Sequence, residues 1–365
     1  MQIHQIIQEL EQWAPLAYQE DYDNCGLLVG DRLQACSGIL ISLDVTESVL
    51  EEAITKKANL IVAHHPFIFR GLKQINGNRS IDRILIQAIK HDIVIYAIHT
   101  NLDNIFEGVN KAIAEKIGLE KLNILQPKSG LLRKLSTFVP PSHKEIVLNA
   151  LFDAGAGHVG DYSECSFIMS GIGTFLPNEG TRPFSGSIGT RSNDPEEKIE
   201  VIFQKDGEKR VIQALFNSHP YEEVAYDIVN LSNDYQKVGS GMTGTLPEPV
   251  DELQFLRHLQ QCFGTAVIRH SPLLGKKISK VAVCGGAGVF MTSKAIQSGA
   301  DILVTADIKY HDFFDAEGKL ILADIGHWES EQYTIDLISA FLSKKFPTFA
   351  VLKTEVQTNP VRYFV

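Results

Sequence analysis

The first third of the chain alternates short apolar runs with segments whose apolar residues are spaced as in a helix. Residues 38–43, 60–63 and 93–98 are apolar runs of strand length, and each ends in polar residues. Between these runs, residues 46–54 and 80–90 have the apolar spacing of amphipathic helices. This alternation predicts an α/β fold for this part of the chain.

The same order of elements returns after residue 275. Apolar runs at 280–284, 300–307 and 320–325 predict strands, and residues 292–298 predict a helix. We interpret the two series as an internal duplication, in which a strand-helix-strand-helix-strand unit occurs twice.

The region between the two repeats, residues 127–238, has a different pattern. Its predicted elements are, in order, strand 135–139, helix 143–154, strands 166–176 and 198–204, helix 209–218 and strand 224–231. This βαββαβ order is that of a ferredoxin-like α+β domain. Two roles are open for the turn at 219–223. It binds a ligand or a neighbouring subunit, or it only fixes the turn between helix 209–218 and strand 224–231. We therefore predict an inserted domain that interrupts a discontinuous core of residues 1–126 and 239–365.

Composition places the chain among soluble proteins. A length of 365 residues exceeds what one hydrophobic core usually organises, and the 44% hydrophobic and 21% charged content is ordinary for globular domains. No apolar run approaches the roughly 18 residues that span a bilayer. The five cysteines are scattered without a CxxC pair, which favours reduced thiols and a cytoplasmic location. A net charge of −10 disfavours generic binding to nucleic acid or to anionic membranes.

Five side chains of types that bind metals follow the predicted strands of the two repeats. They are His64, His65, Asp103, His327 and Glu331. Open α/β sheets bind their ligands at the carboxyl ends of strands. Each of these side chains or pairs, taken alone, is more often an ordinary surface residue or a helix-capping pair. Their joint placement at strand ends favours a metal site. Imidazole and carboxylate donors without thiolates suit Zn²⁺, Fe²⁺, Mn²⁺ or Co²⁺.

The spacing of these residues suits two metal ions. Successive residues of an extended chain point to opposite sides, so His64 and His65 can each serve one of two neighbouring ions. His327 and Glu331 are four residues apart at the start of a predicted helix and share one of its faces. A carboxylate can bridge two ions ~3.5–4 Å apart, as in two-metal hydrolases.

Other residues at strand ends are candidates for supporting roles. His99 and Asp103 repeat the His-x3-acid spacing of the second half, so His99 is a ligand, a partner of Asp103 or a remnant of the duplication. Asp44 and Asp307 either line the pocket or are solvated turn residues. The loop 285–288, Gly-Gly-Ala-Gly, is interpreted primarily as a tight turn, and a contact to phosphate or substrate is the second interpretation.

Taken in order, the motifs resemble those of a known family. The segments that carry the likeness are Ser42-Leu43-Asp44-Val45-Thr46, Ala63-His64-His65-Pro66, His99-Thr100-Asn101-Leu102-Asp103 and Gly326-His327-x3-Glu331. They resemble the GTP cyclohydrolase I type 2 family, the widespread Nif-three-like family of dinuclear-metal proteins, over the whole chain. Residues 160–167 and 219–223 resemble the insert of the longer bacterial members, which is similar to PII and CutA proteins.

The resemblance carries expectations about fold, site and assembly. It implies a duplicated α/β core with mixed sheets, interrupted by a ferredoxin-like insert. It implies two divalent ions per subunit, and a toroidal homohexamer whose metal sites face its cavity. The implied metal ligands are His64, His65, Asp103, His327 and a bridging Glu331.

Two classes of function follow from this resemblance. The first is a metal-dependent hydrolase that acts on a nucleotide-like small molecule, with GTP ring opening as the named candidate. The second is a non-enzymatic metal-handling or regulatory protein whose insert senses a ligand or partner. The second class stays open because the sequence shows no unmistakable guanine pocket.

Overall fold

The apolar runs of the first repeat become neighbouring parallel strands in the computed structural model, which describes residues 1–364. The first sheet has the order β1-β4-β3-β2-β15. Its strands are β1 (Gly26–Val29), β2 (Ile39–Ser42), β3 (Leu60–Ala63), β4 (Val94–Ala97) and β15 (Val351–Lys353). Every residue of β2, β3 and β4 is buried, as expected for strands covered on both faces.

The second sheet repeats the strand order of the first. Its order is β11-β14-β13-β12-β10-β5, in which β12, β13 and β14 are parallel and β11 runs antiparallel to β14. The strands are β5 (Glu120–Ser129), β10 (Asp234–Val250), β11 (Arg269–His270), β12 (Ile278–Val283), β13 (Ile302–Thr305) and β14 (Ile321–Asp324). Likewise β1 runs antiparallel to β4 in the first sheet. The series β1-β4-β3-β2 thus corresponds to β11-β14-β13-β12, as a duplication predicts.

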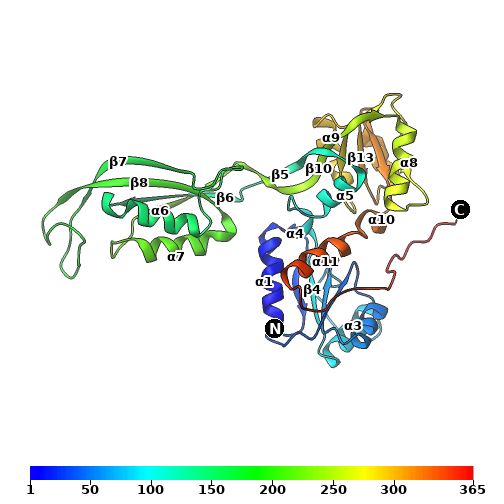
Figure 1. The fold of residues 1–365 in the computed structure, drawn as a ribbon, viewed down its shortest axis with the longest axis horizontal. Helices are drawn as coiled ribbons and strands as arrows, with labels where there is room; N and C mark the ends of the chain where they lie inside the picture. The colour runs from blue at the N-terminus through cyan, green and yellow to red at the C-terminus, as the bar shows by residue number, and fades with distance from the viewer. Residues whose placement is uncertain (365) are drawn as a thin grey trace. The chain divides into compact units, whose positions relative to one another are not determined.

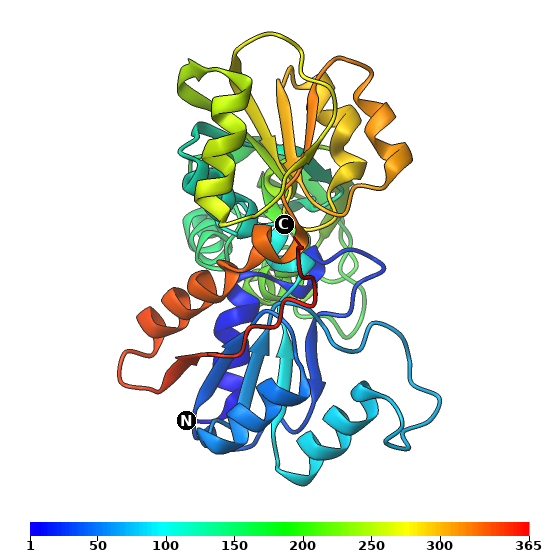
Figure 2. The same ribbon diagram turned by 90° about the vertical axis from the view of Figure 1, so that its right-hand side faces the viewer.

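Helices complete this part of the molecule. Figure 2 shows β1 to β4 of the first sheet in blue and cyan, and β12 to β14 of the second sheet in yellow and orange. The α-helices are α1 (Ile3–Trp13), α2 (Glu47–Thr55), α3 (Ser80–Lys90), α4 (Thr100–Asp103), α5 (Val109–Ile117), α8 (Glu252–Phe263), α9 (Thr292–Gln297), α10 (His327–Glu331) and α11 (Thr334–Lys345). The short 3₁₀ segments are η1 (Leu16–Tyr18), η4 (Val289–Met291) and η5 (Tyr310–Ala316). The second repeat therefore connects β13 to β14 through the 3₁₀ segment η5, whereas the first repeat connects β3 to β4 through the α-helix α3.

Local chemistry explains where these helices begin. The Thr46 hydroxyl accepts a hydrogen bond from the Val49 N–H at 3.2 Å and caps α2. Apolar residues of α2 and α3, such as Val49 and Leu85, pack against Leu40 and Ile61 of the first sheet. Burial of these amphipathic faces holds the parallel strands in register.

The chain divides into two compact units, residues 1–127 with 237–365, and residues 128–236. The second unit has the element order β6 (Leu132–Val139), η2 (Pro141–His143), α6 (Lys144–Asp153), β7 (Ser166–Phe175), β8 (Ser192–Gln204), η3 (Lys205–Gly207), α7 (Glu208–Ser218) and β9 (Tyr226–Leu231). Its four strands pair antiparallel in the order β7-β8-β6-β9.

One face of this four-stranded sheet carries both helices of the second unit. Figure 1 shows α6 and α7 side by side along the sheet. Leu148 and Leu151 of α6 and Leu215 of α7 pack with Ile199 and Val201 of β8 in one apolar core. The opposite face of the sheet carries no helix among the described residues of this unit, so its side chains are partly exposed.

No helix within residues 1–364 is both long and apolar enough to cross a membrane.

Candidate metal centre

Parallel pairing brings the histidines of the first repeat together. Ala63 at the end of β3 is in register with Ala97 at the end of β4. The residues that follow, His64 and His65 on one strand and His99 on the next, therefore emerge side by side. The imidazole centroids of His64 and His65 lie 5.2 and 5.3 Å from that of His99. The sheet thus collects three imidazoles at one edge.

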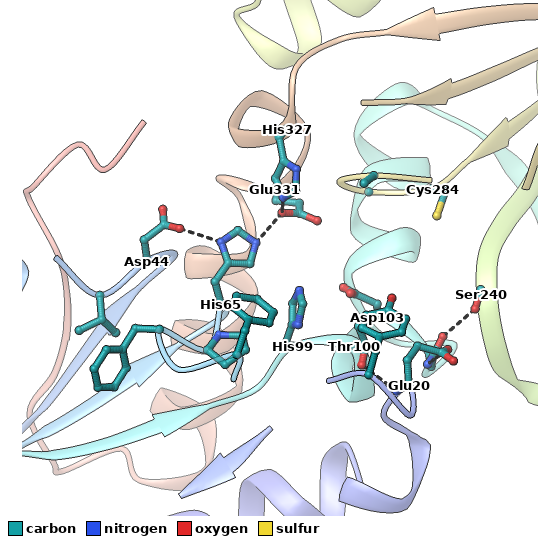
Figure 3. Close-up of a pocket in the computed structure, with 18 of the residues that line it drawn as sticks. Glu20, Asp44, His65, His99, Thr100, Asp103, Ser240, Cys284, His327 and Glu331 are labelled. Carbon is teal, nitrogen blue, oxygen red and sulfur yellow. Dashed lines mark hydrogen bonds and ion pairs between the residues drawn. The ribbon is translucent and has the colours of Figure 1, made fainter. Parts of the chain in front are cut away.

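The second repeat supplies a histidine and a carboxylate to the same place. His327 and Glu331 are the first and last residues of α10, which follows β14. The helical spacing puts both side chains on one face, and their Nε2 and Oε2 atoms are 3.0 Å apart. Glu331 is only 3% exposed, and Figure 3 shows it pointing toward His65.

The two oxygens of Glu331 face two different groups of donors. Oε2 lies 2.9 Å from Nε2 of His65 and 3.0 Å from Nε2 of His327. Oε1 lies 4.0 Å from Nε2 of His64, which is itself 3.6 Å from Oδ1 of Asp103. The carboxylate therefore stands between a His65–His327 group and a His64–Asp103 group.

Each imidazole at this centre is held through its Nδ1 atom. The Nδ1 contacts are His64 with the Ile98 carbonyl oxygen at 2.8 Å, His65 with Asp44 at 2.8 Å, His99 with Asp23 at 2.9 Å and His327 with Asp307 at 2.7 Å. A histidine that donates from one nitrogen to an oxygen presents the other nitrogen as a fixed donor to a metal. The anchors thus orient the four imidazoles before any ligand arrives.

Two polar atoms of the centre are buried without a hydrogen-bond partner among residues 1–364: Nε2 of His64 and Oδ1 of Asp103. An unsatisfied buried polar atom costs stability, so native structures pair nearly all of them with protein, water or an ion. His64 is fully buried, and burial lowers the pKa of its imidazole to about 3. A neutral imidazole with a free Nε2 beside a carboxylate oxygen fits a metal cation well.

The remaining charges form a buried network. Burial opposes ionisation of Glu331, but hydrogen bonds to His327 and His65 hold the pKa of its carboxyl well below the ordinary value. Although burial lowers the pKa of His65, its bonds to Asp44 and Glu331 raise that pKa to about 10. The pKa of His327 is likewise raised to about 9 against the effect of burial, mainly by Glu331.

The pKa of the Asp103 carboxyl is shifted in the opposite direction to that of Glu331. Burial and the neighbouring Glu331 charge raise the pKa of its carboxyl well above the ordinary value. Two carboxylates with opposite pKa shifts at one buried site are typical of functional centres, because a cation is needed to make both ionise together.

The centre opens into a cavity of about 590 Å³. Aromatic side chains of Tyr22, Phe69 and Phe290 line it and are 70%, 53% and 61% exposed. No lysine or arginine lines this cavity among the residues that the structure describes. The space accommodates a small molecule beside the imidazoles.

The structure brings four of the five predicted metal ligands, His64, His65, His327 and Glu331, into compact groups of donor atoms, and it places Oδ1 of Asp103 3.6 Å from Nε2 of His64. Two sets of three side chains have donor atoms close enough to hold an ion: His64, His65 and His99, and His65, His327 and Glu331. Asp44 and Asp307, which the sequence leaves open, anchor imidazoles. The carboxylate partner of His99 is Asp23, whereas pairing with Asp103 was one of the three roles that the sequence left open.

Asp23 is the residue that sequence reasoning missed. It accepts from His99 and from the Thr100 backbone N–H at 3.0 Å, and its side chain is fully buried. Its only sequence signal is a polar turn, which does not show which residue it faces.

The loop 285–288 is a tight turn. The Gly285 N–H donates to Asn110, the Gly286 N–H to the Ser330 hydroxyl and the Gly288 N–H to the Thr305 hydroxyl. These three donors are already used within the protein, so they are not available to an anion. The loop instead packs against the side chain of Glu331.

Comparison with known proteins agrees with this architecture. The family model described as Duf34/NIF3 (NGG1p interacting factor 3) matches residues 1–360. A GTP cyclohydrolase 1 type 2 homolog from Halalkalibacterium halodurans is 40% identical over 98% of both chains, and one from Bacillus subtilis is 39% identical over 98% of both chains.

Solved structures show the same similarity. A Bacillus cereus protein related to NIF3 is 37% identical, with a TM-score of 0.88 over 100% of this chain and 99% of that one. The Staphylococcus aureus protein SA1388 is 27% identical, with a TM-score of 0.79 over the same shares. The mixed α/β fold and the family resemblance expected from the sequence are therefore confirmed.

Proposed function

The chain belongs to the Duf34/NIF3 family, and from this premise we propose that it binds two divalent metal ions and uses them to hydrolyse a nucleotide-like substrate. His64 and Asp103 would hold one ion, and His65 and His327 the other. Glu331 would contribute one oxygen to each. His99 would join the first group or support it.

The single observation that carries this proposal is the position of Glu331 between two donor groups. Its oxygens face His65 and His327 on one side and His64 on the other. Each of these three imidazoles is anchored through Nδ1. Imidazole and carboxylate donors suit Zn²⁺, Fe²⁺, Mn²⁺ or Co²⁺. The unpaired atoms of His64 and Asp103 support the same assignment.

Bound divalent ions supply Lewis acidity and lower the pKa of water. The residues of the chain have separate tasks. Asp44 and Asp307 keep His65 and His327 in place. The aromatic side chains around the cavity, such as Tyr22 and Phe69, present flat surfaces to a ring of the substrate. The name of the relatives points to GTP as the first substrate to test.

A second function, metal handling without turnover, is favoured by one observation. The cavity has no lysine or arginine in its described lining to bind the phosphates of a nucleotide. A protein that stores or transfers the metal needs no such contact. The inserted unit would then sense a ligand or partner.

Metal content and turnover can be measured on the same purified protein. We expect about two ions per chain. We expect roughly half of the metal to remain in His64→Ala, which removes a donor from one group, and almost none in Glu331→Ala, which removes a donor from both. His158→Ala, an exposed histidine of the second unit, is the matched control and should keep all of the metal. Full metal content in both site variants would refute the site.

Turnover of GTP and a panel of nucleotides then separates the two functions. Hydrolysis that needs metal and disappears in the double variant His64→Ala/Glu331→Ala supports the hydrolase. Activity that persists in this variant, or no metal-dependent activity at all, contradicts it. Transfer of bound metal to an apo-protein without turnover supports metal handling.

A further inference from the structure

A second cavity, of about 700 Å³, lies within the inserted unit. It is bordered by β7, by the segment that follows β7 as far as residue 185, and by residues 221–225, which follow α7. Figure 1 shows β7 at the edge of the four-stranded sheet. The cavity belongs entirely to residues 128–236, so it is separate from the candidate metal centre.

Aromatic rings form part of the wall of this cavity. Phe138, Phe175, Phe184 and Tyr221 line it, together with the thioether of Met169. The ring of Phe184 lies 5.8 Å from that of Tyr221, centroid to centroid. These side chains offer apolar surface and aromatic faces to a ligand.

The segment over the cavity is tied down at several points. The Arg182 N–H donates to Oε1 of Glu222 at 2.8 Å, and the Ser185 hydroxyl donates to Asp194. The Tyr221 hydroxyl donates to Oε1 of Glu196 at 2.9 Å. The wall is therefore formed before a ligand binds, which reduces the entropy lost on binding.

The charged groups of the lining are mostly negative. The lining contains three carboxylates, those of Glu196, Glu222 and Glu223, and one ammonium, that of Lys198. The Nζ atom of Lys198 lies 2.6 Å from Oε1 of Glu200, so its charge is already paired. Within residues 1–364, no lysine, arginine or histidine forms an ion pair with any of the three carboxylates of the lining.

We propose that this cavity binds a small organic amine, an ammonium group attached to an aromatic or aliphatic body. The ammonium group would lie near the carboxylates of Glu196 and Glu222 and against the aromatic faces, which attract cations. The body would bury its apolar surface against Phe184 and Met169. A carboxylic acid or phosphate would be repelled by the same charges.

Methionine methyl NMR of the full-length protein tests this proposal directly. The chain has four methionines, and Met169 alone lies in the inserted unit. With ¹³C-methyl methionine, phenethylamine should shift the Met169 signal in a saturable way and leave Met242 and Met291 unchanged. 2-Phenylethanol, a neutral molecule of similar shape, should bind about tenfold more weakly, a difference of about 1.4 kcal/mol. 3-Phenylpropionate should not bind.

Variants separate the carboxylates from the apolar wall. In Glu196→Gln/Glu222→Gln, both hydrogen bonds to Tyr221 and Arg182 can still form, but the negative charges are gone. Phenethylamine should then bind no more tightly than 2-phenylethanol. Glu145→Gln, which removes an exposed carboxylate on α6, is the matched control and should bind like the unaltered protein.

A third variant fills the cavity. Gly171 lines it on β7, and a Cβ there would meet no atom within 4 Å. Gly171→Leu should therefore fold normally and abolish binding of both phenethylamine and 2-phenylethanol. The proposal is overturned if the amine and the alcohol bind equally, if neither shifts Met169, or if the amine preference survives in Glu196→Gln/Glu222→Gln.

Discussion

Histidines in this protein differ in how many of their ring nitrogens the chain itself uses. At the candidate metal centre, Nδ1 of His64 is bonded to a carbonyl oxygen and Nε2 has no hydrogen-bond partner within the described chain. His219, in the inserted unit, uses both nitrogens: Nε2 donates to the Phe138 carbonyl oxygen at 2.9 Å, and Nδ1 accepts from the Tyr221 N–H at 3.1 Å. The first pattern leaves a donor for a metal, and the second fixes a turn.

His219 gives a prediction about pH. Burial lowers the pKa of its imidazole below the ordinary value of 6.5, although the bond to Phe138 acts in the other direction. A histidine whose folded pKa is depressed stabilises the fold fully above the unfolded pKa and loses that contribution as pH falls toward the folded pKa. The inserted unit should therefore lose stability as the pH falls below about 6.5.

An NMR titration of the His219 ring, assigned with His219→Gln, checks the sign. The expected pKa lies below 6.5, and amide exchange of α7, corrected for intrinsic rates, should speed up from pH 7 to pH 5.5. In His219→Gln this pH dependence should be weaker. A measured pKa above 6.5 would contradict the inference that burial dominates the pKa of His219.

At the scale of elements, the duplication places chemistry at strand ends. β3 and β4 of one repeat and β14 of the other each end just before a side chain of the centre. Parallel strands end at the same edge of a sheet, so residues that are far apart in sequence emerge together. Copying the unit thus supplies a second set of donors in the same kind of position.

The loop 285–288 yields a prediction about one element. Gly286 has φ +58°, and a Cβ there would lie 2.5 Å from Oε1 of Glu331. Gly286→Ala should therefore displace Glu331 and lower metal affinity about 10–100-fold, as loss of a supporting contact does in metalloproteins. Isothermal titration calorimetry, in which metal is added to the metal-free variant, measures this change.

Gly299→Ala is the matched control for backbone strain. Gly299 also has a left-handed backbone, φ +75°, but a Cβ there would meet no atom within 4 Å. Gly299→Ala should lose about 1 kcal/mol of unfolding free energy, because a side chain disfavours this conformation. Gly286→Ala should lose at least as much, because its Cβ also meets the Glu331 carboxylate. Only Gly286→Ala should lose metal affinity, and equal affinities in the two variants would refute the role of the loop.

At the scale of the whole molecule, we propose that the chain assembles as a homohexamer, as its resemblance to Nif-three-like proteins implies. Closed symmetric assemblies are the rule for soluble oligomers. Light scattering during size-exclusion chromatography should give a mass close to six times the 40.5-kDa chain. The mass should persist on dilution to micromolar concentrations. A monomer or dimer mass under these conditions would contradict the proposal.

Local sequence patterns were sufficient to predict the types of metal donor and the strands and helices with regular apolar spacing, but not β5, β10, β11 or β15. The strand predicted at residues 60–63 is β3, and the helix predicted at 143–154 is α6 (Lys144–Asp153), because burial and backbone hydrogen bonding act over a few residues. The same pattern placed His64 and His65 at a strand end. Local periodicity was sufficient for both.

Which of these residues meet depends on the tertiary fold. Glu331 contacts His65 across 266 positions of sequence, and His99 contacts Asp23 across 76. Such contacts depend on how sheets and helices pack, and the cost of closing the intervening chain is met by the whole core. Polar turns such as the one at Asp23 look alike in sequence. The oxygen that anchors each imidazole is therefore set by the packing of the fold and cannot be identified from the sequence.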